Sequence, residues 1–392
     1  MFKDETKLDI NYLPTRILHR DQENRLLMEF FNFLTRYPDR MAQRVIVTGD
    51  VGTGKTALCQ TFGKNISSEV NKKGTKFRYI HVNCREHRGN LTHIIHQAIT
   101  VFHPNFPSRG YASSEILKTF LQIIEEEQVF IILALDEFDS LIEKEGSDAV
   151  YELTRLQERQ HGKAQYISFI FIQRSLAPLK GLDDSAQSTL QHNIVNLERY
   201  DKESLENILN DRVSGAFEIA TVSEDVIGLI AELACTETGN ARFGIELLWR
   251  AGKYADAQDA EHVEPEFVRQ AVSAIMPTIK RSELEFLCLH EKMLLLAIAR
   301  FFKENKDAYA TLTEIEEAYK IICEEYDENA YSHTQLWKYL HHFTQISIIK
   351  TEIGSTTSRG RSTMISLPTI PARKLEQELH TILTMEHRRH GN

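Results

Sequence analysis

The chain has 392 residues, of which 42% are hydrophobic and 26% are charged, as in ordinary globular domains, and its net charge is −10. The acidic net charge excludes a protein that binds polyanions over its whole surface, and five scattered cysteines without a C-x-x-C pair exclude a disulfide framework. No apolar run reaches membrane-spanning length, so we expect a cytoplasmic chain of two or three domains with no membrane partner.

A glycine-rich segment at residues 49–56 fills every fixed position of the pattern G-x-x-x-x-G-K-[S/T]. A strand-like apolar run precedes it, and apolar residues spaced four apart follow it, as on one face of a helix. This context disfavours a glycine-rich turn that binds nothing, and predicts a loop whose N–H groups surround phosphate oxygens. We expect Lys55 to reach the β- and γ-phosphates of ATP or ADP and Thr56 to ligate Mg²⁺. The expected nucleotide-binding residues here are Val51, Gly52, Thr53, Gly54, Lys55, Thr56 and Ala57.

An acidic motif follows an uninterrupted apolar run at residues 129–135, which is typical of a central parallel strand. We expect Asp136 to hold Mg²⁺ and Glu137 to orient or deprotonate the attacking water. The alternative is a strand that ends in an acidic turn without a chemical role. Further strands are predicted at 77–83 and 166–172 with helices between them. The fold class is therefore α/β, with a parallel sheet and the site at the carboxyl ends of its strands.

The second half of the chain changes its pattern twice. Every segment from 201 to about 275 reads as helical, and a small helical bundle after a nucleotide-binding sheet is the layout of an AAA+ ATPase with its lid. After a predicted linker with a proline at 276–280, three helical patterns (283–302, 312–326 and 332–343) precede a strand, a turn and a strand, which together predict a winged helix. The expected domains are the nucleotide-binding domain at 1–200, the lid at 201–278 and the winged helix at 279–392.

The predicted winged helix is basic, because residues 330–392 contain eight Lys and Arg against four Glu, a net charge of +4. Its third helix would enter the major groove of DNA, and the tip of its hairpin would contact phosphate or the minor groove. The predicted DNA contacts in these two elements are Thr334, Gln335, Lys338, Arg359 and Arg361. The alternative is a winged helix that contacts proteins and leaves these charges solvated.

An ordered series of motifs makes nearly the whole chain similar to one family, the archaeal ORC-type replication initiators, which resemble eukaryotic origin-recognition and cell-division-control ATPases. The segments that carry the resemblance are Tyr12-Leu13-Pro14 with His19-Arg20, the segments 136–141 and 151–155, Tyr200 with Arg212, Gly239-Asn240-Ala241-Arg242, and His290-Glu291-Lys292. The resemblance implies that Tyr200 and Arg212 contact ATP and that Arg242, as the sensor-two residue, lies near the γ-phosphate. It also implies that Arg109, in an inserted loop, touches DNA.

The same resemblance implies an ATP-switched initiator that binds double-stranded origin DNA, helps to recruit the replicative helicase, and works beside other initiator paralogs. Two other classes stay open at this point. One is a DNA-binding regulator of transcription with the same ATP switch. The other is an AAA+ protein remodeller whose winged helix only contacts proteins.

Two positions depart from the pattern of the family. Its sensor-one asparagine follows the strand predicted at 166–172, where this chain has Arg174, or Gln173 if the register slips. Its arginine finger corresponds to Ser185, which cannot stabilise transition-state charge on a neighbour's phosphate as an arginine can. We therefore expect tight nucleotide binding with slow ATP hydrolysis.

Overall fold

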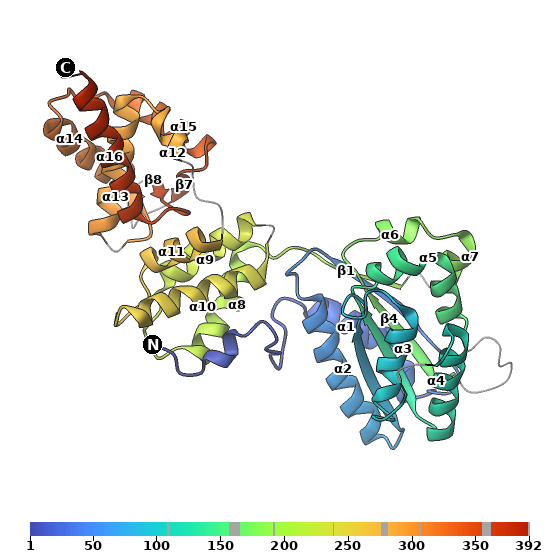
Figure 1. The fold of residues 1–392 in the computed structure, drawn as a ribbon. Helices are drawn as coiled ribbons and strands as arrows, with labels where there is room; N and C mark the ends of the chain where they lie inside the picture. Colours follow the sequence, from blue (N-terminus) through green and yellow to red (C-terminus); the bar gives the residue numbers. More distant parts are fainter. Residues whose placement is uncertain are drawn as a thin grey trace. The chain divides into compact units, whose positions relative to one another are not determined.

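The computed structural model describes residues 1–107, 110–156, 165–190, 193–237, 239–275, 281–305, 307–354 and 362–390. The chain divides into two compact units (Figure 1). The sheet unit consists of Leu13–Tyr200 with Thr238–Ala241, and the helical unit of Met1–Tyr12, Asp201–Glu237 and Arg242–Asn392. The first residues of the chain thus fold with the helical unit. The domain boundaries expected at 200 and 278 stay predictions.

The sheet unit is built on five parallel strands in the order β2-β3-β4-β1-β5. The strands are β1 (Arg44–Gly49), β2 (Phe77–Asn83), β3 (Phe130–Asp136), β4 (Ile167–Ile172) and β5 (Asn193–Leu197). Because all five run in the same direction, their carboxyl ends meet at one edge of the sheet. The end of β4 lies between the ends of β1 and β3, the two strands that lead into the predicted nucleotide motifs.

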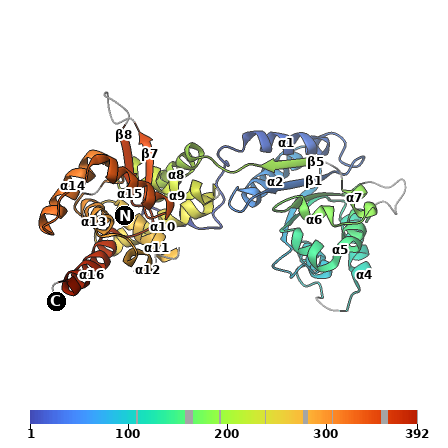
Figure 2. The same cartoon turned by 90° about the horizontal axis from the view of Figure 1, so that it is seen from above.

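Helices cover both faces of this sheet, as Figures 1 and 2 show. One face packs against α1 (Asp21–Phe31) and α2 (Lys55–Lys72), and the other against α3 (Leu91–Thr100), α4 (Ser113–Glu127) and α5 (Asp139–Thr154). Alternate residues of one strand therefore enter different cores: Val45 and Val47 lie in the first, and Ile46 in the second. Burial on both faces explains the uninterrupted apolar runs and confirms the predicted α/β fold class.

Short helices and the last strand complete the sheet unit. Two short helices, α6 (Ala177–Lys180) and α7 (Asp184–Thr189), follow β4. The edge strand β5 was not predicted from the sequence. Its residues alternate between exposed and buried, so it has no continuous apolar run to reveal it.

The helical unit begins with a bundle that the short helix η1 (Glu5–Leu8) joins from the start of the chain. The bundle helices are α8 (Lys202–Ala216), α9 (Glu224–Thr236), α10 (Ala241–Ala257) and α11 (Pro265–Ile275). Lys3 and Asp4 both donate backbone hydrogen bonds to the carbonyl of Ala216, at distances of 2.8 and 3.0 Å. Glu5 accepts hydrogen bonds at 2.7 Å from both Trp249 and Lys253. These contacts hold the N-terminal segment against the bundle.

The remainder of the helical unit is a winged helix, as predicted. Its helices are α12 (Arg281–Glu285), α13 (Leu289–Glu304), α14 (Leu312–Glu325), α15 (His333–Gln345) and α16 (Ala372–His390), and its antiparallel sheet has the order β6 (Ala310–Thr311), β8 (Ser362–Ser366), β7 (Lys350–Gly354). The helix predicted at 283–302 is interrupted, because Glu291 accepts the backbone N–H of Cys288 at 2.8 Å and caps a new helix there. Among the described residues, no helix is long and apolar enough to cross a membrane.

A fully buried arginine joins the bundle to the winged helix. Arg269 of α11 is 1% exposed, and its Nε donates to the carbonyl oxygen of Leu367 at 2.8 Å. Its Nη2 donates to the carbonyl oxygen of Asp307 at 3.4 Å, and its guanidinium lies 4.6 Å from the ring centroid of Phe302. The planar guanidinium thus satisfies two carbonyls of the winged helix at once.

Candidate functional site

The phosphate-binding loop predicted at 49–56 connects β1 to α2. Gly52 and Gly54 have φ angles of +78° and +88°, in the left-handed region that favours glycine. A Cβ atom at Gly52 would lie 1.8 Å from Oδ1 of Asn240, so the loop also needs glycine to let this segment approach. Thr53 is buried and its hydroxyl donates to the carbonyl oxygen of Asp50 at 2.8 Å, whereas Val51 is exposed. The two glycines and the Thr53 hydroxyl therefore hold the loop in this conformation, and its role in binding phosphate stays a prediction.

The start of α2 suits a phosphate group. Within the described residues no side chain caps this helix, and its first turn, which includes Ala57, contains no acidic residue. The Nζ of Lys55 donates to the carbonyl oxygens of Gly49 and Asp50 at 2.6 and 2.7 Å. Burial lowers the pKa of Lys55, and the charge of Arg174 lowers it further against the attraction of Asp136. A phosphate anion would offset both effects by favouring the charged ammonium.

Asp136 lies at the end of β3, where three groups contact its carboxylate. The hydroxyl of Thr56 donates to Oδ2 at 2.6 Å, and the backbone N–H of Glu137 donates to Oδ1 at 2.9 Å. The Nε2 atom of His81 lies 3.2 Å from Oδ2. Burial alone would raise the pKa of Asp136, but the contacts with His81, Thr56 and the Glu137 backbone outweigh it and lower the pKa below its usual range. The carboxylate is thus ionised at neutral pH.

The donor set at this point fits Mg²⁺. A threonine hydroxyl and an ionised carboxylate are hard oxygen ligands, and Thr56 and Asp136 lie in hydrogen-bond contact with each other. These two side chains, predicted from motifs far apart in the sequence, are therefore brought together. Val51, Gly52, Thr53, Gly54, Lys55 and Ala57 lie around the start of the same helix.

Glu137 has a φ angle of +50°, which is uncommon for a residue other than glycine. Its side chain is 34% exposed, and its Oε1 lies 3.8 Å from Nη1 of Arg85. Strained backbone of this kind is concentrated at functional sites, where the surrounding structure holds it. Glu137 thus presents a partly exposed carboxylate directly after Asp136, and its role toward water stays a prediction.

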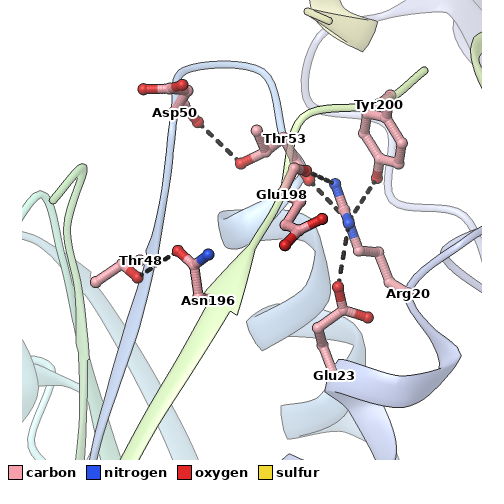
Figure 3. A network of polar contacts seen from close by, with 8 residues as sticks. All are labelled: Arg20, Glu23, Thr48, Asp50, Thr53, Asn196, Glu198 and Tyr200. Atoms are coloured by element: carbon pink, nitrogen blue, oxygen red, sulfur yellow. Dashed lines mark hydrogen bonds and ion pairs between the residues drawn. The ribbon is translucent and has the colours of Figure 1, made fainter. Parts of the chain in front are cut away.

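A buried arginine outside the predicted site links the phosphate loop to the end of β5 (Figure 3). The Nε of Arg20 donates to the carbonyl oxygen of Thr53 and to the hydroxyl of Tyr200, both at 3.2 Å. Its Nη2 donates to the carbonyl oxygen of Glu198 at 2.5 Å, its Nη1 pairs with Glu23 at 3.1 Å, and the guanidinium lies 4.0 Å from the Tyr200 ring centroid. Tyr200 is thereby held near the loop, and its contact with ATP stays a prediction.

Comparisons with known proteins agree along the chain. Three family models match: AAA domain at residues 39–176, Cdc6 AAA+ ATPase-type lid domain at 206–273, and CDC6 C-terminal winged helix domain at 282–376. The chain is 31% identical over 373 residues to ORC1-type DNA replication protein 2 of Saccharolobus solfataricus, and the match covers 94% of this chain and 90% of that protein. The chain belongs to the Cdc6/ORC1 family of DNA replication proteins.

Solved structures of this family have the same fold. Cdc6p from Pyrobaculum aerophilum matches with a TM-score of 0.86 and 28% identity, over 98% of this chain and 99% of that one. The Aeropyrum pernix ORC1 protein, solved in complex with DNA, matches with a TM-score of 0.64 and 25% identity, over 96% of each chain. The resemblance inferred from the motifs is confirmed.

Two predicted nucleotide contacts of this Cdc6/ORC1 chain lie in the helical unit. Arg212 of α8 is largely buried, with its guanidinium 4.7 Å from the ring centroid of Tyr12 and its Nη1 3.5 Å from the carbonyl oxygen of Lys7. Arg242 is the second residue of α10. Since the phosphate loop belongs to the sheet unit, the roles of both arginines toward the nucleotide stay predictions.

The two positions that depart from the Cdc6/ORC1 pattern lie on different elements. Gln173 directly follows β4 and is 1% exposed, and neither atom of its amide has a hydrogen-bond partner among the described residues. Arg174 is exposed, and its carbonyl oxygen accepts the N–H of Gly49 at 3.2 Å. Ser185 is exposed in the first turn of α7, which Asp183 caps.

The predicted DNA-reading face of this Cdc6/ORC1 chain lies on α15. Thr334 and Lys338 are exposed there, and Gln335 is half-buried. Trp337, which is 48% exposed, shares this face and was missed, although its spacing of three residues from Thr334 signals it. The predicted contacts Arg109, Arg359 and Arg361 lie outside the described residues.

Proposed function

We propose that this Cdc6/ORC1 chain is an ATP-binding replication initiator that binds origin DNA and helps to recruit the replicative helicase, with ATP as its switch. The observation that carries the proposal is that Thr56 contacts Asp136 directly after Lys55 of the phosphate loop, in a chain that also has a winged helix. Membership of the Cdc6/ORC1 family supports the biological role.

The proposed roles in the nucleotide site follow from the chemistry of each side chain. Lys55 and the N–H groups at the start of α2 bind the phosphates, while Thr56 and Asp136 would hold Mg²⁺. When bound, Mg²⁺ supplies charge neutralisation at the phosphates. Glu137 orients or deprotonates the attacking water, and Arg242 couples the lid to the γ-phosphate. Tyr200 and Arg212 complete the proposed ATP contacts.

We propose slow ATP hydrolysis because this chain has other residues at the positions of the family's arginine finger and sensor-one asparagine. Ser185 is too short and carries no charge to act on the phosphate of a neighbouring chain. Arg174 replaces an amide with a charged group beside the phosphate loop. The ATP-bound state would therefore last long after binding. This feature also favours a second candidate, an ATP-switched transcriptional regulator that loads no helicase.

The proposed DNA interface consists of α15, the hairpin tip and the inserted loop. Thr334, Gln335 and Lys338 would read the major groove, and the arginines Arg359, Arg361 and Arg109 would contact the backbone or the minor groove. The DNA complex of the Aeropyrum pernix ORC1 relative supports a DNA partner for this chain. Other initiator paralogs are further proposed partners.

Fluorescence anisotropy on the duplex beside the chain's own gene tests the proposal. A scrambled duplex is the control, and ATP, ADP and a salt series are compared. We expect tighter binding to the native duplex, with losses in Arg361→Ala and Lys338→Ala but not in Lys320→Ala, a matched charge removal on the exposed side of α14. Absence of binding to either duplex would contradict a DNA-reading function.

A second assay separates the two candidate functions. The replicative helicase is mixed with the native duplex, the chain and ATP, and its retention on the DNA is measured. Retention that needs both the chain and ATP supports an initiator. Tight, specific DNA binding without retention of the helicase supports the regulator.

A further inference from the structure

His81 contacts the nucleotide site although it belongs to neither nucleotide motif. It lies on β2, whose register places it opposite Ala134 on β3, two residues before Asp136. Because side chains alternate along a strand, His81 and Asp136 point to the same face of the sheet, the face that α2 covers. The Nε2 atom of His81 lies 3.2 Å from Oδ2 of Asp136.

The chemistry of the partners assigns the tautomer of His81. An ionised carboxylate only accepts hydrogen bonds, so Nε2 of His81 carries a proton and donates to Asp136. Its other ring nitrogen, Nδ1, lies 3.4 Å from the hydroxyl of Tyr79, which can donate to it. A ring that carries a proton on Nε2 and accepts at Nδ1 satisfies both neighbours. The order of contacts is therefore Tyr79, His81, Asp136, Thr56.

Packing against α2 holds this series in place. A Cβ atom at Gly63 would lie 2.3 Å from Cδ1 of Tyr79, so the helix has a glycine where the tyrosine ring approaches it. Tyr79 belongs to the core on this face of the sheet. The ring of His81 is itself largely buried, with 17% of its side chain exposed. The imidazole thus has little freedom to turn away from Asp136.

We propose that His81 is a positioning residue that holds the Asp136 carboxylate in the orientation required to bind Mg²⁺ with the nucleotide. The inference rests on the nucleotide-binding part of the proposed function. Thr56 is itself an expected Mg²⁺ ligand. The N–H of His81 cannot bind a metal ion, so its contribution at this site is the hydrogen bond to Asp136. Residues that orient a metal ligand through a hydrogen bond contribute about 10- to 100-fold to metal affinity.

Mg²⁺ titration of the full chain with a fluorescent ATP analogue at fixed concentration tests this role, with anisotropy as the readout. We expect His81→Leu to raise the Mg²⁺ midpoint about tenfold or more, and His81→Gln, whose amide N–H can reach the place of Nε2, to shift it less than about threefold. Affinity for the analogue in excess chelator should stay unchanged in both. His93→Leu, at an exposed position of α3, is the control and should match the wild type.

Two further variants separate positioning from folding. His81→Asn keeps a polar amide but is too short to place a donor at Nε2, so we expect it to behave like His81→Leu while it retains the wild-type thermal transition. Tyr79→Phe removes the hydroxyl that faces Nδ1, and we expect a smaller shift of the Mg²⁺ midpoint in the same direction.

Three results would overturn the inference. A wild-type midpoint in His81→Leu or in His81→Asn would mean that the donor at Nε2 does not matter. An equal loss of affinity with and without Mg²⁺ would mean that His81 acts on the fold of the site and not on the metal position. If the wild-type chain binds no nucleotide at any Mg²⁺ concentration, the proposed function fails as well, which distinguishes this failure from the first two.

Discussion

At the scale of single residues, Gln173 combines deep burial with an amide that has no hydrogen-bond partner among the described residues. Such a group costs stability, and Gln173→Met, an apolar replacement of similar size, should raise the free energy of unfolding by about 1 kcal/mol or more. Urea unfolding without nucleotide measures this. If the amide serves the nucleotide, the increase in melting temperature caused by Mg²⁺ and ATP will be smaller in the variant. A loss of stability in the variant without nucleotide would contradict the first expectation.

Glu137 offers a second test at this scale. Glu137→Gln removes the proposed base while it keeps the shape of the side chain, so hydrolysis should fall about 100-fold with little change in ATP affinity. Single-turnover hydrolysis and equilibrium binding measure the two quantities. Glu143→Gln, an exposed position of α5, is the control. Rapid, DNA-stimulated turnover in the wild type, abolished by Glu137→Gln, would contradict the proposed slow hydrolysis.

The site also illustrates which residues a sequence can reveal. The phosphate loop and Asp136 are local patterns next to apolar strands, so their places at the ends of β1 and β3 could be predicted from the sequence. The contact between His81 and Asp136 depends on the pairing of β2 with β3, which no local pattern specifies. The contacts of Arg20 with Thr53 and Tyr200 likewise join segments far apart in the chain, so no local pattern predicts them.

At the scale of elements, the start of α13 depends on a single carboxylate. Glu291 accepts the N–H of Cys288 at 2.8 Å and lies 2.6 Å from Nδ1 of His342 on α15. Burial alone would raise the pKa of Glu291, but these hydrogen bonds lower it below the ordinary value of 4.5. The carboxylate therefore both begins α13 and ties it to the predicted DNA-reading helix.

The sign of the resulting pH dependence follows from this lowered pKa. The contribution of Glu291 to stability is fully present above pH 4.5 and is lost as the pH falls through the lower pKa of the folded state. We expect the difference in melting temperature between wild type and Glu291→Gln to shrink on going from about pH 6 to about pH 3. Thermal unfolding across this range measures it. A difference that is constant with pH would show that ionised Glu291 contributes nothing.

Element boundaries were the least predictable level. The pattern over 283–302 is helical throughout, and only the cap at Cys288 reveals the break between α12 and α13. The edge strand β5 has polar residues at Asn193 and Asn196, which hide it from a search for apolar runs. By contrast, the strand predicted at 77–83 coincides with β2, because its apolar residues are bounded on both sides by polar ones.

At the scale of the whole molecule, the lid bundle and the winged helix belong to one compact unit, and Arg269 is a buried link between them. Its removal leaves the carbonyl oxygens of Leu367 and Asp307 without this donor and breaks the ion pair of 3.4 Å with Glu266. We expect Arg269→Ala to lower the free energy of unfolding by about 2–4 kcal/mol, and Arg269→Lys to recover part of it, since an ammonium cannot match the planar fork.

If this link matters, the bundle and the winged helix should unfold together, and the tryptophans of the chain can report on each of them. It has two tryptophans, Trp249 on α10 and Trp337 on α15, so Trp337→Phe and Trp249→Phe variants report on the bundle and on the winged helix separately. In the wild-type background both probes should show the same urea midpoint. Adding Arg269→Ala should separate the two midpoints, because each part then unfolds by itself.

A matched control distinguishes the buried link from any loss of charge. Arg250→Ala removes an arginine whose pair with Glu246 is half-exposed on α10, and surface pairs contribute about 0–1 kcal/mol. The urea midpoints reported by the two tryptophans should stay equal in this variant.

The same comparison in Arg269→Ala decides whether the link is needed. If the two urea midpoints stay equal there, other contacts between the bundle and the winged helix are enough to make them unfold together, and a signal from the lid could reach α15 without Arg269. If they separate, the position of the predicted DNA-reading helix relative to the lid depends on one guanidinium. Nucleotide-dependent DNA binding should then be lost in Arg269→Ala at temperatures where both parts are still folded.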